Sequence, residues 1–198
     1  MLKQLWLTSL ALVVGALFLT RPSSPFDISA LEGATVPFKC VHNKTLCTAF
    51  SINQQRGYYM SAAHCLIEGT PFIDGHPSQL LFQDDALDVA VFRTESFRWA
   101  LPPSRKPIVV TERLMAYGYG YGLAQPLFKE LRVAGVNIAF ANDSWSLVDS
   151  SVIPGMSGGP IINLRGEVVG LVQQSDTLTS GFRSFDLIYK ATQKYWER

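Results

Sequence analysis

The sequence predicts an all-β fold built in two halves, with a helix only near its C-terminal end. Short apolar runs alternate with turn-forming residues along most of the 198-residue chain, a pattern typical of β-barrels and β-sandwiches. A proline-rich break at residues 101–107 separates an earlier group of these runs from a later one. Only residues 184–197 have apolar residues spaced as a helix requires.

The predicted strands fall into two groups, each bounded by glycine, proline, asparagine and aspartate residues that favour turns. Before the break they are residues 34–40, 46–53, 57–62, 79–83 and 87–93. After the break they are residues 108–117, 128–140, 146–149, 159–163 and 167–173. A chain of this length can bury one sizeable core or two small ones.

Residues 1–25 are expected to form a targeting segment and a short linker. Lys3 precedes residues 5–20, which carry no charge. This run is slightly long for the core of a signal peptide and slightly short for a membrane-spanning helix. Prolines just after it interrupt the nearest cleavage sites, which favours an uncleaved signal anchor over a cleaved signal peptide. Either interpretation places residues 26–198 outside the cytoplasm, tethered to a membrane or secreted.

Charge and composition exclude several classes of function. Lysine and arginine number 17 against 16 acidic residues, a net charge of +1. The chain has no basic stripe, which argues against nucleic acid as a partner. It also has no internal repeat, which argues against a solenoid. The glycine-rich residues 118–122 do not form a nucleotide-binding fingerprint, because no strand–turn–helix unit surrounds them.

The most informative motif is Gly155-Met156-Ser157-Gly158-Gly159-Pro160. A serine among glycines sits on a turn that only glycine-rich backbone can follow. Such a turn can present a hydroxyl and aim backbone N–H groups at one point beside it. These N–H groups would stabilise the oxyanion of an acyl-transfer intermediate. A tight glycine turn with an idle serine is the alternative interpretation.

A serine nucleophile needs a base, and the base needs a group that orients it. Of the three histidines, His64 closes an apolar, strand-like run, whereas His42 and His76 lie in polar, turn-rich surroundings. Asp88 opens the apolar run of residues 88–92 and is the best orienting carboxylate, because a carboxylate entering a core needs a hydrogen-bonding partner. The rivals are Asp84 and Asp85, which precede that strand in what is predicted to be a solvated turn.

Three segments, residues 62–65, 88–91 and 155–160, together resemble the trypsin/chymotrypsin-type serine proteases, whose catalytic residues also follow the order His, Asp, Ser. Residues 148–170 are similar to the HtrA-like (DegP-like) branch. The resemblance covers residues 34 to 195 and is specific only at the three catalytic segments. It implies two packed six-stranded antiparallel β-barrels, the first at about residues 34–100 and the second at about 108–183, followed by the C-terminal helix.

The resemblance also implies a function and a set of site residues. His64, Asp88 and Ser157 would form the catalytic triad of an endopeptidase that acts on peptide or protein substrates without a metal or other cofactor. The N–H groups of Gly155 and Ser157 would form the oxyanion hole. The pocket for the substrate side chain would be lined by Ser151, Val172, Gln173 and Gln174. The uncharged Ser151 at its floor predicts an uncharged side chain on the acyl side of the cut.

Two features of this group of proteases are missing. Met156 stands where digestive-type relatives carry an aspartate that binds a newly cut N-terminus, so no activating cleavage is expected. The residues after Ser157 are too few for the PDZ module that HtrA-like enzymes usually carry. Regulation through that module is therefore not expected, and the oligomeric state is left open.

Three cysteines suit an extracytoplasmic protein. The resemblance implies a disulfide between Cys47 and Cys65, which would pin the histidine loop to the preceding strand. Cys40 is then left over as a buried thiol, although a Cys40–Cys47 pair is an alternative. Metal binding by Cys40 and His42 is a weaker option, because the ligands for a full coordination shell are absent.

Two functions of other classes remain as alternatives. The first is a catalytically silent, protease-like module that binds peptides or a partner protein. The second is an esterase or acyltransferase that uses the same serine. An α/β-hydrolase would place serine first and histidine last in the chain, and the order of His64, Asp88 and Ser157 is the reverse.

Overall fold

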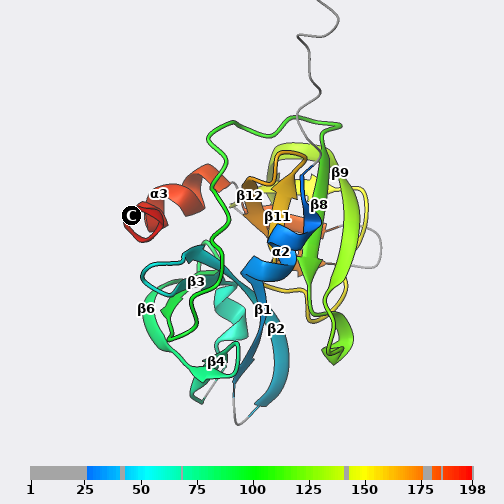
Figure 1. Ribbon diagram of the computed structural model, residues 1–198. Helices are drawn as coiled ribbons and strands as arrows, with labels where there is room; N and C mark the ends of the chain where they lie inside the picture. Colours follow the sequence, from blue (N-terminus) through cyan, green and yellow to red (C-terminus); the bar gives the residue numbers. More distant parts are fainter. Residues whose placement is uncertain are drawn as a thin grey trace, which may run out of the picture.

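The computed structural model describes residues 26–40, 43–67, 69–140, 143–175, 180–183 and 185–197. They form two curled antiparallel sheets that pack against each other, with one helix at the C-terminal end (Figure 1). The predicted leader, residues 1–25, lies outside the described residues. Within the ranges given, no helix has both the length and the apolar character needed to cross a membrane.

The first sheet contains seven strands. They are β1 (Thr35–Cys40), β2 (Asn43–Asn53), β3 (Tyr58–Ser61), β4 (Pro71–Ile73), β5 (His76–Pro77), β6 (Gln79–Asp84) and β7 (Val89–Arg93). Their spatial order is β5-β4-β1-β2-β3-β7-β6. All pairings in this sheet are antiparallel, and β3 connects to β7 through a one-turn 3₁₀ helix, η1 (Ala63–Cys65), and the β4–β6 strands.

The second sheet also contains seven strands. They are β8 (Arg113–Gly118), β9 (Leu127–Phe140), β10 (Asp143–Val148), β11 (Pro160–Asn163), β12 (Val168–Leu171), β13 (Gln174–Ser175) and β14 (Ser180–Arg183). A second 3₁₀ helix, η2 (Gly120–Gly122), links β8 to β9. The spatial order is β12-β11-β8-β9-β10-β14-β13.

The two sheets share one topology. Counted from its own first strand, each sheet has the order 5-4-1-2-3-7-6. In both, the first three strands form a meander. The sixth and seventh strands pair with each other, and the seventh lies beside the third. The chain therefore repeats a fold without a visible sequence repeat, since the same architecture can be filled by different apolar residues.

A short helix precedes the first sheet. Helix α2 (Ile28–Ala34) is capped by Asp27, whose side chain accepts a hydrogen bond from the Ser29 N–H at 2.9 Å. Leu31 and Ala34 are fully buried and anchor the helix to the core. The helix leads directly into β1 and lies across the front of the two sheets in Figure 1.

The C-terminal helix α3 (Phe185–Trp196) leaves the second sheet and packs back onto the first. The Tyr195 ring meets Tyr58 edge-on, with centroids 5.8 Å apart, and Trp196 lies 6.5 Å from Phe50. Burying aromatic rings of this size contributes several kcal/mol relative to exposed rings. The helix thus joins the end of the second half to the core of the first.

The apolar cores of the two halves are joined, because one cluster of buried residues contains members from both sheets. The larger cluster is built on the first sheet but also includes Tyr117, Ile162, Val168 and Leu171 from the second. A smaller cluster fills the second sheet and contains the fully buried Met156. Packing of the two sheets through shared apolar residues fixes their relative position, and with it the position of the loops between them.

The prediction of two packed antiparallel β-units with a C-terminal helix is confirmed, with some corrections. Each sheet has seven strands rather than six, because each includes one extra strand of two residues. The strand predicted at residues 108–117 begins only at Arg113. Val109 and Val110 lie outside the sheet and are 60% and 48% exposed, since Thr111 takes a left-handed conformation (φ 73°) that interrupts the strand.

Candidate active site

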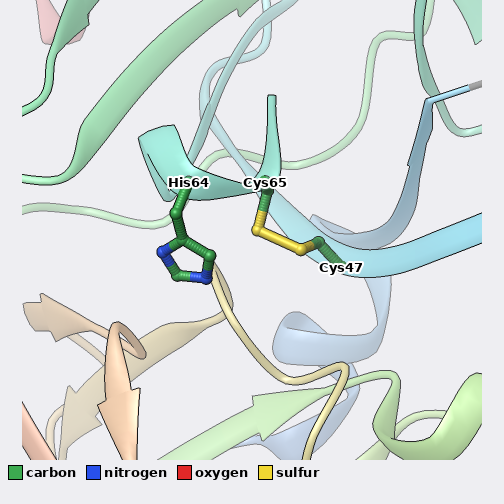
Figure 2. Close-up of side chains that lie close together, drawn as sticks. All are labelled: Cys47, His64 and Cys65. Atoms are coloured by element: carbon green, nitrogen blue, oxygen red, sulfur yellow. A yellow bond between two sulfur atoms is a disulfide. The ribbon is translucent and has the colours of Figure 1, made fainter. Parts of the chain in front are cut away.

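His64 is presented by a turn that the disulfide pins in place. It lies in η1, immediately after β3, and its side chain is 46% exposed. The next residue, Cys65, is joined to Cys47 of β2 by a disulfide, as Figure 2 shows. The alternative Cys40–Cys47 pair is thereby wrong, and Cys40 is a buried free thiol. The His64 imidazole and the Cys65 sulfur leave this turn on the same side.

Asp88 holds the His64 turn at two points. Its Oδ2 lies 2.8 Å from the imidazole Nδ1, and its Oδ1 accepts a hydrogen bond from the His64 main-chain N–H at 2.9 Å. An ionised carboxylate can only accept, so the proton of the neutral imidazole belongs on Nδ1 and Nε2 is left with its lone pair. This arrangement leaves His64 able to take a proton at Nε2.

The local backbone explains why Asp88 reaches the histidine. Asp88 has a left-handed conformation (φ 48°) just before β7. The rival carboxylates are occupied within the same turn: Asp84 accepts from the Leu87 N–H at 2.9 Å, and Asp85 accepts from the Gln83 side chain at 2.7 Å. Both therefore stabilise the turn that delivers Asp88.

The Ser157 turn comes from the second sheet and requires glycine at two positions. Gly155 and Gly158 have φ angles of 97° and 80°, values that favour glycine. A Cβ on Gly155 would clash with the Tyr119 carbonyl oxygen, and one on Gly158 would clash with Ser61 and Thr48. The turn can therefore follow this path only with glycine at both positions.

The His64 turn and the Ser157 turn meet at the main chain of Ser157. Its carbonyl oxygen accepts a hydrogen bond from the Thr48 N–H at 2.8 Å and lies 3.8 Å from the Cys65 Sγ. Cys65 follows His64 directly, so the serine turn lies against the histidine turn. Among the described residues, no hydrogen bond joins the His64 imidazole to the Ser157 hydroxyl. Such bonds are often long in free enzymes and shorten when substrate binds.

The N–H groups of Gly155 and Ser157 have no acceptor among the described residues, whereas their neighbours do. The Met156 N–H donates to the Ile153 carbonyl at 3.0 Å, and the Gly158 N–H donates to the Val172 carbonyl at 2.7 Å. One turn thus contains two N–H groups that have no acceptor within the described part of the chain. Both are available to a negatively charged oxygen.

His64 also lies near two sulfur atoms, within 4.8 Å of potential ligand atoms on Cys47 and Cys65. Both sulfurs share in the disulfide, and a metal would need thiolates. The group therefore offers only the imidazole. His42, the second residue of the weaker metal-binding option with Cys40, lies outside the described residues. The Cys40 Sγ lies 3.5 Å from the Cys65 carbonyl oxygen.

A protein-family model for the trypsin-like peptidase domain matches residues 47–171, which include all three segments of the site. The chain belongs to the trypsin-like peptidase family.

Curated relatives in this family are named as proteases. The chain is 29% identical over 153 residues to a probable periplasmic serine endoprotease DegP-like from Halomonas elongata, covering 70% of this chain and 31% of that one. It is 30% identical over 112 residues to a protein of the same name from Pseudomonas savastanoi pv. phaseolicola, covering 53% of this chain and 23% of that one. The chain thus spans less than a third of these relatives.

Solved structures of two bacterial proteases share the fold. The active form of the Rv3671c protease from M. tuberculosis superposes with a TM-score of 0.73 at 18% identity, covering 89% of both chains. A serine endoprotease from Yersinia pestis superposes with a TM-score of 0.69 at 18% identity, covering 88% of this chain and 68% of that one. At this identity the likeness shows the trypsin-like fold alone.

The residues expected to line a substrate pocket in this trypsin-like chain differ in their burial and in their contacts. Ser151 is partly exposed in the loop before the serine turn. Val172 is buried in the second core, and its main chain pairs with Gly158 and Gly159. Gln174 pairs with Gly181 through its main chain in β13, and its side chain lies outside the description.

Gln173 makes contacts that the sequence does not indicate. Its side-chain amide donates to the carbonyl oxygens of Leu87 (2.5 Å) and Asp88 (3.0 Å), and its Oε1 accepts from the Arg183 N–H at 2.6 Å. Gln173 is only 6% exposed. It therefore fastens the turn that carries Asp88 to the second sheet.

Thr48 is a residue of the site that the sequence analysis did not identify. It follows Cys47 in β2, is fully buried and contacts the serine turn with both its main chain and its hydroxyl. Its partner Gly155 is 107 residues away in the chain. No local pattern in the sequence signals such a contact, and only the packing of the two sheets brings it about.

Proposed function

We propose that this chain is a serine endopeptidase that hydrolyses peptide bonds through an acyl-enzyme. The observation that carries the proposal is the His64–Asp88 pair, with Nδ1 and Oδ2 2.8 Å apart, on a disulfide-pinned turn that faces the Ser157 turn. Family membership and the protease names of the curated relatives support the same reaction.

The proposed reaction begins with attack of the Ser157 Oγ on a peptide carbonyl carbon. His64 Nε2 takes the serine proton and then gives it to the leaving amine. Asp88 keeps the imidazole in the tautomer that has Nε2 free, and it stabilises the imidazolium that forms. A water molecule, deprotonated by His64, then cleaves the ester bond to Ser157 and releases the acyl product.

The negative charge of the tetrahedral intermediate would be held by the N–H groups of Gly155 and Ser157. These groups are oriented before the substrate arrives, because the peptide units around them are hydrogen-bonded elsewhere. Donors oriented in advance need no reorganisation during the reaction, and the loss of one donor in such a site typically lowers kcat by about 10²–10³-fold.

The proposed substrates are peptides or proteins outside the cytoplasm. The relatives named as periplasmic support this location, as does the expected leader at residues 1–25, acting as a membrane anchor or as a cleaved signal peptide. A neutral residue, Ser151, at the floor of the pocket would favour an uncharged side chain on the acyl side of the cut. Cleavage after basic residues in a peptide library would contradict this preference.

The proposal is tested by hydrolysis of a fluorogenic peptide chosen from the products of casein digestion. Ser157→Ala is expected to lower kcat by about 10⁶-fold, and Asp88→Asn by about 10⁴-fold, the sizes found in measured triads. Asp85→Asn is the matched control: within the described residues the Asp85 carboxylate accepts one hydrogen bond, from the Gln83 side chain, and an amide oxygen can still accept it, so this variant should keep the parent rate. A parent chain that cleaves neither casein nor peptides would identify the silent binding module instead.

A further inference from the structure

We propose that Thr48 is a positioning residue for the oxyanion hole: its buried hydroxyl, on the first sheet, holds the serine turn of the second sheet in the conformation that stabilises the transition state. This inference rests on the proposed protease function. Thr48 would touch neither substrate nor reacting atoms. It would act through the peptide groups of the turn.

The Thr48 side chain makes hydrogen bonds to two segments of the second half of the chain. Thr48 Oγ1 donates to the Gly155 carbonyl oxygen at 3.0 Å and accepts from the Tyr119 N–H at 2.8 Å. A hydroxyl has a single proton to donate, and the Tyr119 N–H can only donate. The Thr48 proton is therefore directed at Gly155.

The main chain of Thr48 adds two further bonds. Its N–H donates to the Ser157 carbonyl oxygen at 2.8 Å, and its carbonyl oxygen accepts from the Ser61 hydroxyl at 2.8 Å. One residue thus binds the carbonyl groups on both sides of Met156. It is also the direct neighbour of Cys47, whose disulfide holds the His64 turn (Figure 2).

These bonds complete a set that fixes every peptide unit of the turn. Each unit is planar, so its N–H points opposite to its carbonyl. The Pro154 carbonyl accepts from the Tyr121 N–H at 2.7 Å, which turns the Gly155 N–H the other way. The Met156 carbonyl accepts from the Gly159 N–H at 2.8 Å, which does the same for the Ser157 N–H.

The peptide units of the Pro154 and Met156 carbonyls are each followed by a unit that Thr48 binds. These two units carry the Gly155 and Ser157 carbonyls. Gly155 needs this support most, because glycine without a Cβ changes its backbone conformation at little cost. Without the Thr48 hydroxyl, the Gly155 carbonyl loses its side-chain donor from the first sheet. The peptide unit between those that carry the Gly155 and Ser157 N–H groups is then held less firmly.

The matched comparison uses two buried threonines of neighbouring strands. Thr48→Val keeps the shape of the side chain and removes the hydroxyl, whereas Thr48→Ser keeps the hydroxyl. Thr35 on β1 is 1% exposed, and its Oγ1 has no hydrogen-bond partner in the described part of the chain. Thr35→Val therefore makes the same chemical change on an adjacent strand without removing a bond.

The experiment measures kcat and KM for a fluorogenic peptide, the inhibition constant of the matching peptidyl trifluoromethyl ketone, and the urea midpoint of unfolding. Ser157 adds to the ketone carbon and gives its proton to His64, and the new oxyanion occupies the oxyanion hole. In Thr48→Val we expect kcat to fall about 10- to 100-fold, KM to stay within twofold, and the inhibition constant to rise by the same factor as kcat falls. Thr48→Ser should stay within about threefold of the parent, and Thr35→Val should match it.

Each other outcome overturns the inference in a recognisable way. A Thr48→Val enzyme with parental kcat shows that the hydroxyl does not position the turn. A fall in kcat with an unchanged inhibition constant, or one that Thr48→Ser fails to restore, shows a structural role only. A parent chain that neither cleaves peptide nor binds the ketone overturns the proposed function as well, whereas an active parent with an indifferent Thr48→Val overturns this inference alone.

Discussion

Removal of the Cys47–Cys65 disulfide should lower stability by an amount that can be worked out from the chain. The bonded cysteines are 18 residues apart. In the chain-entropy model, opening a loop of that size costs about 3 kcal/mol of unfolding free energy at 25 °C. For a domain of this length, each kcal/mol shifts the melting temperature by about 2–4 °C. The Cys47→Ala/Cys65→Ala variant should therefore melt about 6–12 °C below the parent.

The assay is thermal and urea unfolding with and without a reducing agent. The parent should lose the same stability when reduced, whereas the double variant should not respond to the reductant. Cys40→Ala is the control: Cys40 is a buried free thiol, so this variant should lose about 1 kcal/mol at most and still respond to reduction. A parent whose melting temperature is insensitive to reduction, or a double variant within 1 °C of it, would refute the reasoning.

Two further predictions concern other contacts. Gln173→Leu removes two hydrogen bonds to the turn of Asp88 and one from Arg183; unfolding free energy should fall by about 2–3 kcal/mol, and urea midpoints equal to the parent would contradict this. For Asp74, burial raises the pKa, but hydrogen bonds from Arg98 and Ser96 outweigh it and hold the pKa below its usual value. Its stabilisation is therefore present above about pH 4 and lost as the pH falls through the lowered pKa. Asp74→Asn should flatten the acid limb of the stability–pH curve, and an unchanged limb would count against it.

The strands with strong apolar runs were predictable from the sequence, and the missed elements depend on tertiary contacts. β4 begins with Pro71 and has three residues, so its pairing with β1 defines it more than its composition does. β14 contains Gly181 and forms by pairing with β10. Helix α2 has seven residues, too few to be stable alone, and it is held by its Asp27 cap and buried Leu31.

The residues of the candidate site also differ in whether the sequence around them predicts their role. Ser157 and His64 stand in local motifs whose residue types suggest their chemistry. Asp88 differs from Asp84 and Asp85 because it opens an apolar run. Thr48 and Gln173 have no such motif. Their partners lie 107 and 85 residues away. Each side chain is polar and buried, and its residue type alone does not say which groups it binds. Only the packing of one sheet on the other decides what these residues bind.

The measurement that tests the central claim most directly is the intact mass of the protein after reaction with a fluorophosphonate. Attack by the Ser157 Oγ forms a phosphorus–oxygen bond and expels fluoride, while the serine proton passes to His64. The parent and the control Ser150→Ala should each gain one adduct, whereas Ser157→Ala should gain none and His64→Ala should react far more slowly. An unmodified parent, or an adduct of equal yield on Ser157→Ala, would contradict the assignment of Ser157 as an activated nucleophile.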